Sequence, residues 1–226
     1  MHEYSNTPGR HYPRTLAYKA HLPHRKELPA GFEVPKSLGP VFRRMSATMK
    51  ALAERVMAGD LDAQGFADAA YDVLADEHSR AWYLGRVRAG SKIPMSDADL
   101  QAGRIAADID SEYLARWRDD ILNGRYFDGE EWNQGAMLTR ANAYALKLRG
   151  TANESFVTDP ESAPFSFNWK LGNSEHCQDC IDFASLSPWQ ADELPSFPGD
   201  CSTICKMGCN CTLIRSDGRQ GFEPFT

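Results

Sequence analysis

Residues 41–59 read VFRRMSATMKALAERVMAG, and this stretch indicates what kind of fold the chain has. Its large apolar residues recur at intervals of three and four: Phe42, Met45, Met49, Leu52 and Val56. That spacing places them along one face of an α-helix. Pro40 suits the first turn of such a helix and Gly59 suits its end. The stretch therefore predicts an amphipathic helix that buries one face against other helices.

Three further helices are predicted in the sequence that follows. One runs from about residue 62 to 87, and a fourth runs from about 130 to 149 with Gly150 at its C-cap. Between them, Ser96 is a good N-cap and Gly124 a good end for the third helix. We therefore predict a mainly α fold, in which residues 41–159 form an antiparallel helical bundle or a set of helical hairpins.

The average composition of the 226 residues conceals three different segments. Six of the thirteen prolines lie in residues 1–40, only Pro94 lies in 41–159, and six lie in 160–226. All six cysteines lie between Cys177 and Cys211. We therefore divide the chain into an N-terminal arm (1–40), a helical body (41–159) and a cysteine-rich, metal-binding lobe (160–226) with a small amount of β-structure.

The arm is predicted to be extended, because its prolines recur too often for a helix to form. Residues 1–44 hold eight Lys/Arg against three Asp/Glu, although the whole chain has a net charge of -6. Apolar and tyrosine side chains interrupt the basic residues, which favours docking on a protein surface over a purely solvated tail. A disordered terminus is the alternative. We expect any DNA contact to be confined to this arm.

The cysteines have the spacing of a zinc site at the end of a β-hairpin. Residues 165–171 alternate apolar and polar side chains, as in a half-buried strand, and lead to Cys177 and Cys180. A second cluster precedes the apolar run Thr212–Ile214 and consists of Cys201, Cys205, Cys209 and Cys211. Two residues between cysteines allow both thiolates to reach one ion, and the second cluster supplies the remaining ligands. The spacing therefore predicts a zinc-ribbon-like lobe with one structural zinc ion per chain.

Six cysteines exceed the four ligands of one tetrahedral ion. Cys177 and Cys180 are the first two ligands that we predict. From the second cluster we favour Cys205 with either Cys209 or Cys211. Cys209 and Cys211 are not both chosen, because two thiolates one residue apart in an extended strand are hard to place on one ion. Cys201 is expected to be a bystander. His176 is a possible substitute ligand, but such a histidine more often has no metal role. Disulfides and free thiols are the alternative states of the cysteines.

Catalytic chemistry is not expected. The sequence has no phosphate-binding loop, dinucleotide fingerprint or G-x-S-x-G motif. His78 follows two acidic residues, but a lone helical histidine is usually structural. A zinc hydrolase is disfavoured because no second set of histidine and acidic ligands accompanies the thiolates. No run of eighteen apolar residues exists, and the N-terminal residues lack the apolar core of a secretory signal, so a membrane partner is not expected.

The C-terminal part resembles the minor head, or head morphogenesis, proteins of tailed bacteriophages. The similarity covers roughly residues 135–215 and rests on a W-x-L-G strand at Trp169–Gly172, the H-C-x-x-C knuckle at 176–180, a P-G turn at 198–199 and the C-x3-C-x-C cluster at 205–211. The sequence departs from this pattern at Cys201, where a small residue is usual, and at Asn210, where a basic residue is common.

This resemblance implies a structural protein of the virion that is made in the host bacterial cytoplasm. It would act in head assembly or DNA packaging, bound to portal or capsid proteins and present in several copies, as in a ring. The alternative is a zinc-ribbon module that binds nucleic acid. Such a module needs basic residues around the cysteines, whereas residues 165–214 hold two lysines against six acidic residues.

Overall fold

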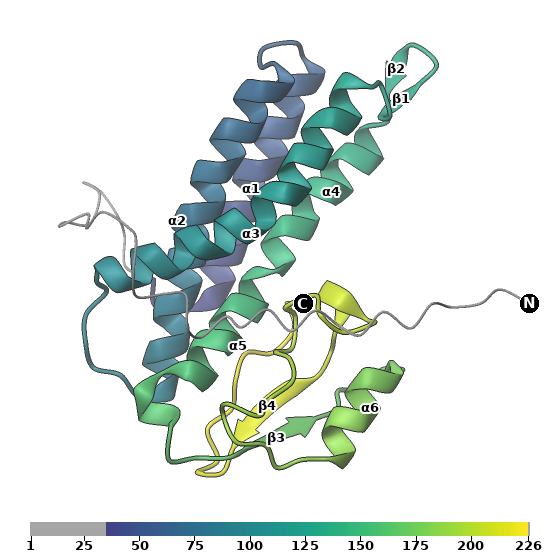
Figure 1. The fold of residues 1–226 in the computed structure, drawn as a ribbon. Coiled ribbons are helices and arrows are strands. Elements are labelled where there is room, and N and C mark those ends of the chain that lie inside the picture. The colour runs from purple at the N-terminus through teal and green to yellow at the C-terminus, as the bar shows by residue number, and fades with distance from the viewer. Residues whose placement is uncertain (1–34, 226) are drawn as a thin grey trace, which may run out of the picture.

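The computed structural model describes residues 35–225, and it is mainly helical, as predicted. Four long helices lie side by side (Figure 1): α1 (Leu38–Met57), α2 (Ala63–Ala89), α3 (Asp97–Leu122) and α4 (Gln134–Leu146). Residues 1–34 of the predicted arm lie outside the described residues, and residues 38–40 form the first turn of α1. Within the described part of the chain, no helix is long and apolar enough to span a membrane.

Capping residues explain both ends of α2 and the start of α3. Asp62 precedes α2, and its carboxylate accepts a hydrogen bond from the backbone N–H of Gly65 at 2.6 Å. Ser96 precedes α3 and forms a capping box with Asp99, whose carboxylate accepts the Ser96 backbone N–H at 2.8 Å. Gly90 ends α2 with φ of 120°, a backbone conformation that favours glycine. These local signals explain why the predicted boundaries lie close to the observed ones.

The prediction of one helix over residues 130–149 is wrong at both ends. A hairpin of β1 (Phe127–Asp128) and β2 (Glu131–Trp132) precedes α4, which begins only at Gln134. Gly150 is not a C-cap, because it lies inside a further helix, α5 (Leu148–Thr158). A Cβ atom on Gly150 would lie 2.5 Å from Asp200 Cα. The glycine therefore allows the lobe to approach α5 closely and does not end a helix.

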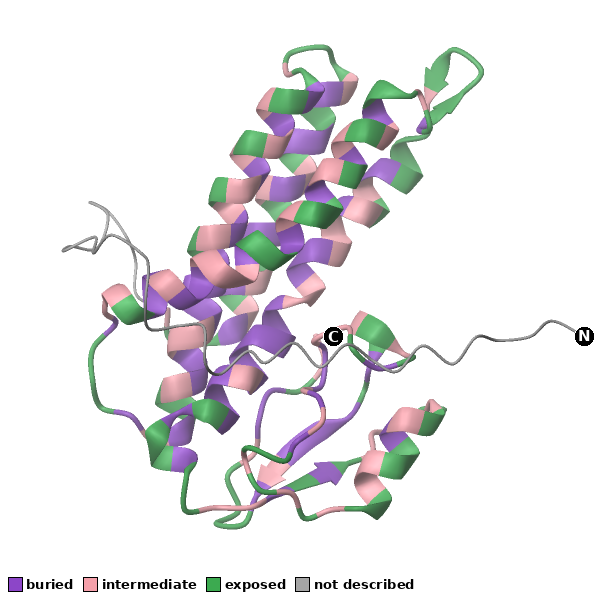
Figure 2. Cartoon of the chain, viewed as in Figure 1, coloured by how far each residue is buried: buried purple, intermediate pink, exposed green. Residues whose placement is uncertain are grey.

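The body has a continuous apolar core (Figure 2). Trp117 of α3 is fully buried and packs against Phe66, with ring centroids 4.6 Å apart, and against Tyr144, at 5.5 Å. Glycines allow the helix backbones to meet. A Cβ atom on Gly103 of α3 would lie 2.3 Å from the Ser79 backbone nitrogen in α2, and one on Gly85 would lie 2.3 Å from the Ala152 carbonyl oxygen in α5. The central position of α2 therefore depends on these two small residues.

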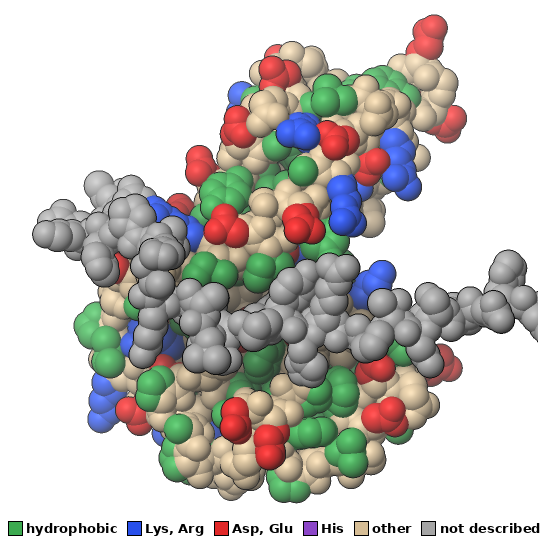
Figure 3. Space-filling model, viewed as in Figure 1, with side chains coloured by type: hydrophobic (Ala, Val, Ile, Leu, Met, Phe, Trp, Pro, Cys, Tyr) green, Lys and Arg blue, Asp and Glu red, His purple; other side chains and the backbone are tan. Residues whose placement is uncertain are grey.

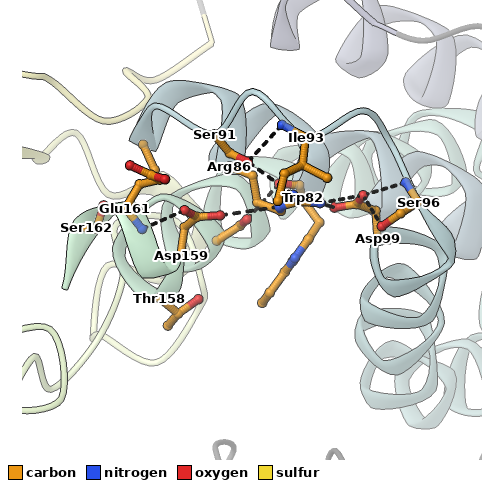
Figure 4. A network of polar contacts seen from close by, with 12 residues as sticks. Trp82, Arg86, Ser91, Ile93, Ser96, Asp99, Thr158, Asp159, Glu161 and Ser162 are labelled. Carbon is orange, nitrogen blue, oxygen red and sulfur yellow. Dashed lines mark hydrogen bonds and ion pairs between the residues drawn. The ribbon is translucent and has the colours of Figure 1, made fainter.

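Arg86 of α2 joins three segments of the body (Figure 4). Its Nη1 donates to both carboxylate oxygens of Asp99 at 2.8 and 2.7 Å, and its Nη2 donates to Ser91 Oγ at 3.1 Å. Its Nε lies 3.3 Å from Asp159, the residue that follows α5. Because Asp99 also caps α3, this network holds the start of α3 and the end of α5 against α2.

The lobe is built on a two-stranded antiparallel sheet of β3 (Phe167–Lys170) and β4 (Thr212–Arg215). The predicted alternation is confirmed, since Phe167 and Trp169 are buried whereas Asn168 and Lys170 are exposed. The lobe also contains the 3-10 turns η2 (Pro160–Ser162) and η3 (Lys206–Gly208), and α6 (Gln178–Ser185). We did not predict α6, because eight residues are too few to show a helical period.

Buried polar side chains hold the lobe against the body. Asn153 of α5 donates to the Pro198 carbonyl at 3.0 Å and accepts the Phe222 N–H at 2.8 Å. Arg215 of β4 is 2% exposed and donates to the carbonyl of Ala89, the last residue of α2, at 2.8 Å. The two parts therefore contact each other through buried hydrogen bonds.

Candidate metal centre

The pairing of β3 with β4 brings the two cysteine clusters together. Lys170 at the end of β3 pairs with Thr212 at the start of β4, so the residues after β3 lie beside those before β4. Cys177 is the N-cap of α6, and Cys180 lies in its first turn. On the other side, Cys205 and Cys209 flank η3 and Cys211 directly precedes β4. Short local turns thus present each thiol, and the sheet determines where they meet.

Five of the six thiols fall into two groups of three that share Cys180. One group is Cys177, Cys180 and Cys205, the other is Cys180, Cys209 and Cys211, and within each group the sulfur atoms lie within 4.8 Å of one another. The sulfur of Cys180 is 3.6 Å from that of Cys205 and 3.7 Å from that of Cys209. With Zn–S bonds of about 2.3 Å, two sulfurs on one tetrahedral ion are about 3.8 Å apart. The thiols are therefore already at the spacing of metal ligands.

The cysteines in the structure are free thiols. A disulfide has a sulfur–sulfur distance of about 2.05 Å, which is much shorter than the distances from Cys180 to its two neighbours. The geometry therefore favours metal binding over the disulfide alternative.

Cys209 and Cys211 both lie close to Cys180, although we favoured only one of them as a ligand. We assumed an extended strand through both residues. Instead, β4 begins at Thr212, so residues 209–211 are not part of the regular strand. A Cβ atom on Gly172 would lie 2.2 Å from the Asn210 carbonyl oxygen, so the glycine lets the chain after β3 approach this segment. Tertiary packing therefore places two thiols one residue apart on the same side of the cluster.

Cys201, the expected bystander, belongs to neither group of three. It is half-buried, and its backbone has φ of 70°, in the region that disfavours side chains. Burial raises the pKa of its thiol to about 11. Cys201 is therefore a neutral thiol outside the cluster, and it offers a matched control for substitutions inside it.

His176 lies at the edge of the cluster, although we did not favour it as a ligand. Its Nδ1 is 3.6 Å from the sulfur of Cys211, and its Nε2 is 3.0 Å from the Gly172 carbonyl oxygen. A carbonyl only accepts, so Nε2 is the donor in this hydrogen bond, and Nδ1 is the ring nitrogen that can bind a metal. A backbone carbonyl that orients a histidine in this way is typical of metal sites. Its position directly before Cys177 was the signal available in the sequence.

The surroundings of the thiols raise the pKa of some of them and lower the pKa of others. Burial, and then the charge of Cys209, raise the pKa of Cys180 well above its usual range. Burial also acts to raise the pKa of Cys177, but hydrogen bonds from the backbone N–H groups of Cys180 and Cys205 lower it overall. A cation is therefore needed if all the thiols are to be thiolates together, because adjacent negative charges disfavour one another.

Arg149 of α5 supplies one positive charge to this region. It is 2% exposed, its Nη2 donates to the Cys209 carbonyl, and its charge interacts with the thiols of Cys209, Cys211 and Cys205. Burial lowers the pKa of Arg149, and the neighbouring Cys209 acts in the opposite direction. A buried cation of this kind fits a negatively charged metal–thiolate cluster.

His78 is part of a buried network inside the body. Its Nδ1 is 2.7 Å from Thr151 Oγ1, and its Nε2 is 3.5 Å from Asp110, whose other oxygen accepts from Lys147 at 2.5 Å. Hydroxyl, imidazole and carboxylate thus have the order of a catalytic triad. However, His78, Asp110 and Thr151 are all buried in the helical interior. The network therefore holds α2, α3 and α5 together and does not present a nucleophile.

Comparisons of the chain with known protein families, curated proteins and solved structures give no match. The cysteine cluster must therefore be interpreted from its own geometry. Its five thiols and one imidazole fit the donor set of zinc, and three of the thiols, those of Cys180, Cys209 and Cys211, are buried.

Proposed function

We propose that this chain is a structural component of a tailed-phage head, a minor capsid or head morphogenesis protein that acts at the portal or inner capsid in head assembly or DNA packaging. Its C-terminal lobe is a docking element stabilised by structural zinc. The observation that carries this proposal is the thiol cluster, because it is formed by the residues in which the resemblance to phage minor head proteins lies. The particle, assembled in the bacterial cytoplasm, is the expected location.

A structural role for the metal is supported by the ligands around it. Among the described residues, the groups of side chains close enough to hold a metal consist of cysteines only. Catalytic zinc sites instead combine fewer thiolates with histidine or carboxylate ligands and an open position for substrate. The shared thiol, Cys180, is buried. We propose that a metal at this position stabilises the fold and that the chain has no enzymatic activity, because neither group of three contains a histidine or a carboxylate that could act with the metal.

The surface of the lobe favours a protein partner. Figure 3 shows acidic and hydrophobic side chains together on the visible face of the lobe. Ile181 and Leu186 on and beside α6 are 43% and 64% exposed, and Ile204 before η3 is 66% exposed. The backbone N–H of Ile204 donates to Asp179 of α6 at 2.8 Å, so Ile204 lies beside this helix. Exposed apolar side chains that gather in one region are typical of protein contacts. We propose that portal or capsid proteins cover them, with several copies of the chain around the assembly.

The alternative function, a zinc-ribbon module that binds nucleic acid, is less favoured. Residues 165–214 contain only Lys170 and Lys206 as basic residues, against six acidic ones. Phosphate contacts require several lysine or arginine side chains, and a local charge of this sign repels the nucleic-acid backbone.

Peptide mapping of phage particles tests the structural role. We expect the wild-type chain in purified heads or in assembly intermediates. Cys180→Ser, which removes the thiol shared by both groups, should prevent incorporation, whereas Cys201→Ser should be incorporated as wild type, because Cys201 lies outside the cluster. Absence of the wild-type chain from particles and intermediates alike would contradict the proposal.

DNA binding by the full chain distinguishes the alternative. The proposal predicts that Lys170→Glu combined with Lys206→Glu leaves the affinity for DNA, and its dependence on salt, unchanged. If the lobe binds phosphates, this double variant should instead weaken binding and reduce the slope of log affinity against log salt by about one or two.

A further inference from the structure

The thiol cluster has more donors than one metal ion can use. A tetrahedral zinc ion takes four ligands. The cluster offers the five thiols of the two groups and Nδ1 of His176. A single ion would leave two of these six donors unused. More of these donors would be used if the cluster held more than one metal ion.

We infer that the cluster binds two metal ions that share the sulfur of Cys180. One ion is held by Cys177, Cys180 and Cys205, and the other by Cys180, Cys209, Cys211 and His176. This inference rests on the proposed metal site and deepens it, because it assigns a second ion, a bridging thiolate and a histidine ligand that a single structural zinc ion does not require.

The arrangement of the thiols supports two ions. The sulfur atoms form two groups of three rather than one group of four, and Cys180 is the member common to both. Its distances to Cys205 and Cys209, 3.6 and 3.7 Å, both match the edge of about 3.8 Å expected between two ligands of a tetrahedral zinc ion. Cys180 is thus close enough to both groups to be a ligand of both ions. A bridging thiolate satisfies both distances without moving the backbone.

His176 completes the buried half. With Zn–N of about 2.05 Å and Zn–S of about 2.3 Å, a nitrogen and a sulfur on one tetrahedral ion are about 3.6 Å apart. The observed distance from His176 Nδ1 to Cys211 is 3.6 Å. The hydrogen bond from Nε2 to the Gly172 carbonyl orients the ring with its lone pair toward the thiols. His176 belongs to neither group of three, so its Nδ1 is at ligand spacing from Cys211 but not from Cys180 or Cys209. The inferred ion has three thiolate ligands, and the imidazole becomes the fourth ligand when the ring moves toward the other two sulfurs.

The other ion has three protein ligands and one remaining position. Cys177 and Cys205 are partly exposed, whereas Cys180, Cys209 and Cys211 are buried. Water can therefore occupy the fourth position beside Cys177 and Cys205. The two ions should differ in lability, because a chelator reaches the solvent-exposed ion first.

The charges also fit two ions. Five thiolates and two divalent ions carry a net charge of -1, which the buried guanidinium of Arg149 compensates. One ion with four thiolates carries -2 and would leave a buried negative charge beside the same arginine. Uncompensated buried charge is strongly unfavourable.

Native mass spectrometry of the full chain reconstituted with Zn²⁺ tests the inference. We expect two ions per chain in the wild type and in Cys201→Ser. His176→Ala should keep only one ion at a chelator concentration at which the wild type keeps two. One ion in the wild type would overturn the inference but leave the proposed structural zinc site intact, whereas no bound zinc would overturn both.

Cadmium-113 NMR of the full chain tests the bridge without any substitution. Two resonances with a scalar coupling between them are expected, because the shared sulfur of Cys180 connects the two ions through bonds. One of them should also correlate with the ring protons of His176. Two uncoupled resonances would overturn the bridge through Cys180, and the absence of a correlation with the histidine would overturn the assignment of His176 as a ligand.

Discussion

The helical body and the cysteine-rich lobe differ in the interactions that are available to stabilise them. The body buries a large apolar cluster that includes Phe66, Trp117 and Tyr144. The apolar cluster of the lobe is much smaller: it has seven buried residues from the lobe itself, and three of them are cysteines of the thiol cluster, Cys180, Cys209 and Cys211. A small segment with two short strands cannot bury enough apolar surface to offset its conformational entropy. We therefore expect apolar burial to stabilise the body and the proposed metal–ligand bonds to stabilise the lobe.

The largest expected effect is the loss of the lobe when metal is removed. Binding of structural zinc contributes about 10–16 kcal/mol in zinc-finger peptides, and that free energy becomes folding free energy. Chelation under reducing conditions should abolish the amide protection of β3, β4 and α6, whereas α1 to α4 should retain theirs. Hydrogen exchange measured by mass spectrometry tests this, and unchanged protection in the lobe would contradict our view of what stabilises it.

The next effect concerns the apolar core of the body. Trp117→Ala should reduce the free energy of unfolding by about 3–5 kcal/mol, because it leaves a cavity between Phe66 and Tyr144. Urea unfolding followed by circular dichroism measures this change. Leu122→Ala, at a position 69% exposed, is the control and should change stability by no more than about 0.5 kcal/mol. Equal effects of the two substitutions would show that the assigned core is wrong.

Glycine contacts give a smaller and more local test. Gly103→Ala should destabilise the body by about 1–3 kcal/mol, because the added Cβ overlaps the backbone of Ser79. The same change at Gly135 in α4 meets nothing closer than 3.8 Å and should stabilise the helix by about 0.5–1 kcal/mol. In thermal or urea unfolding, we expect the two substitutions to change the free energy of unfolding in opposite directions. Changes in the same direction would contradict the close contact between Gly103 and Ser79.

Gly150→Ala applies the same change at the boundary between the two parts. Its Cβ would overlap Asp200, so the lobe should move away from α5 while α1 to α4 stay folded. Hydrogen exchange should show faster exchange around residues 198–203 than in the wild type, with no change in α3. Faster exchange throughout the body would instead show that the two parts unfold as one unit.

The smallest expected effect is the pH dependence of the body. Burial acts to raise the pKa of Asp110, but His78 and Lys147 lower it overall below its usual value. The ionised carboxylate therefore stabilises the fold above its unfolded pKa of about 3.9, and this contribution is lost as the pH falls through the lower folded pKa.

Asp110→Asn should consequently be less stable than the wild type at neutral pH, with a difference that shrinks below about pH 4. Urea unfolding of the helices at a series of pH values measures this difference. Asp119→Asn is the control, because Asp119 is exposed and pairs only with its neighbour Arg118 at the surface. A difference between Asp110→Asn and the wild type that does not change with pH would contradict the assigned ion pairs.

The fold was predictable where local chemistry decides it. The stripe from Phe42 to Val56 lies in α1, Ser96 caps α3, and the alternation before Lys170 is β3. Prediction failed where a distant segment decides the structure. Gly150 has the appearance of a helix end, yet it is a contact point for Asp200, fifty residues away. The short hairpin β1–β2 and the eight-residue α6 have too few residues to produce a period.

The sequence by itself determined the residue types at the candidate site and indicated that Cys201 is not one of the metal ligands. Only the tertiary structure decided how the thiols are grouped, because the register of β3 with β4 determines which thiols meet. It also placed His176 beside Cys211 and the buried cation of Arg149 beside the thiols. Helix periods and caps depend on neighbours within a few residues, whereas metal coordination depends on distances between segments far apart in the chain.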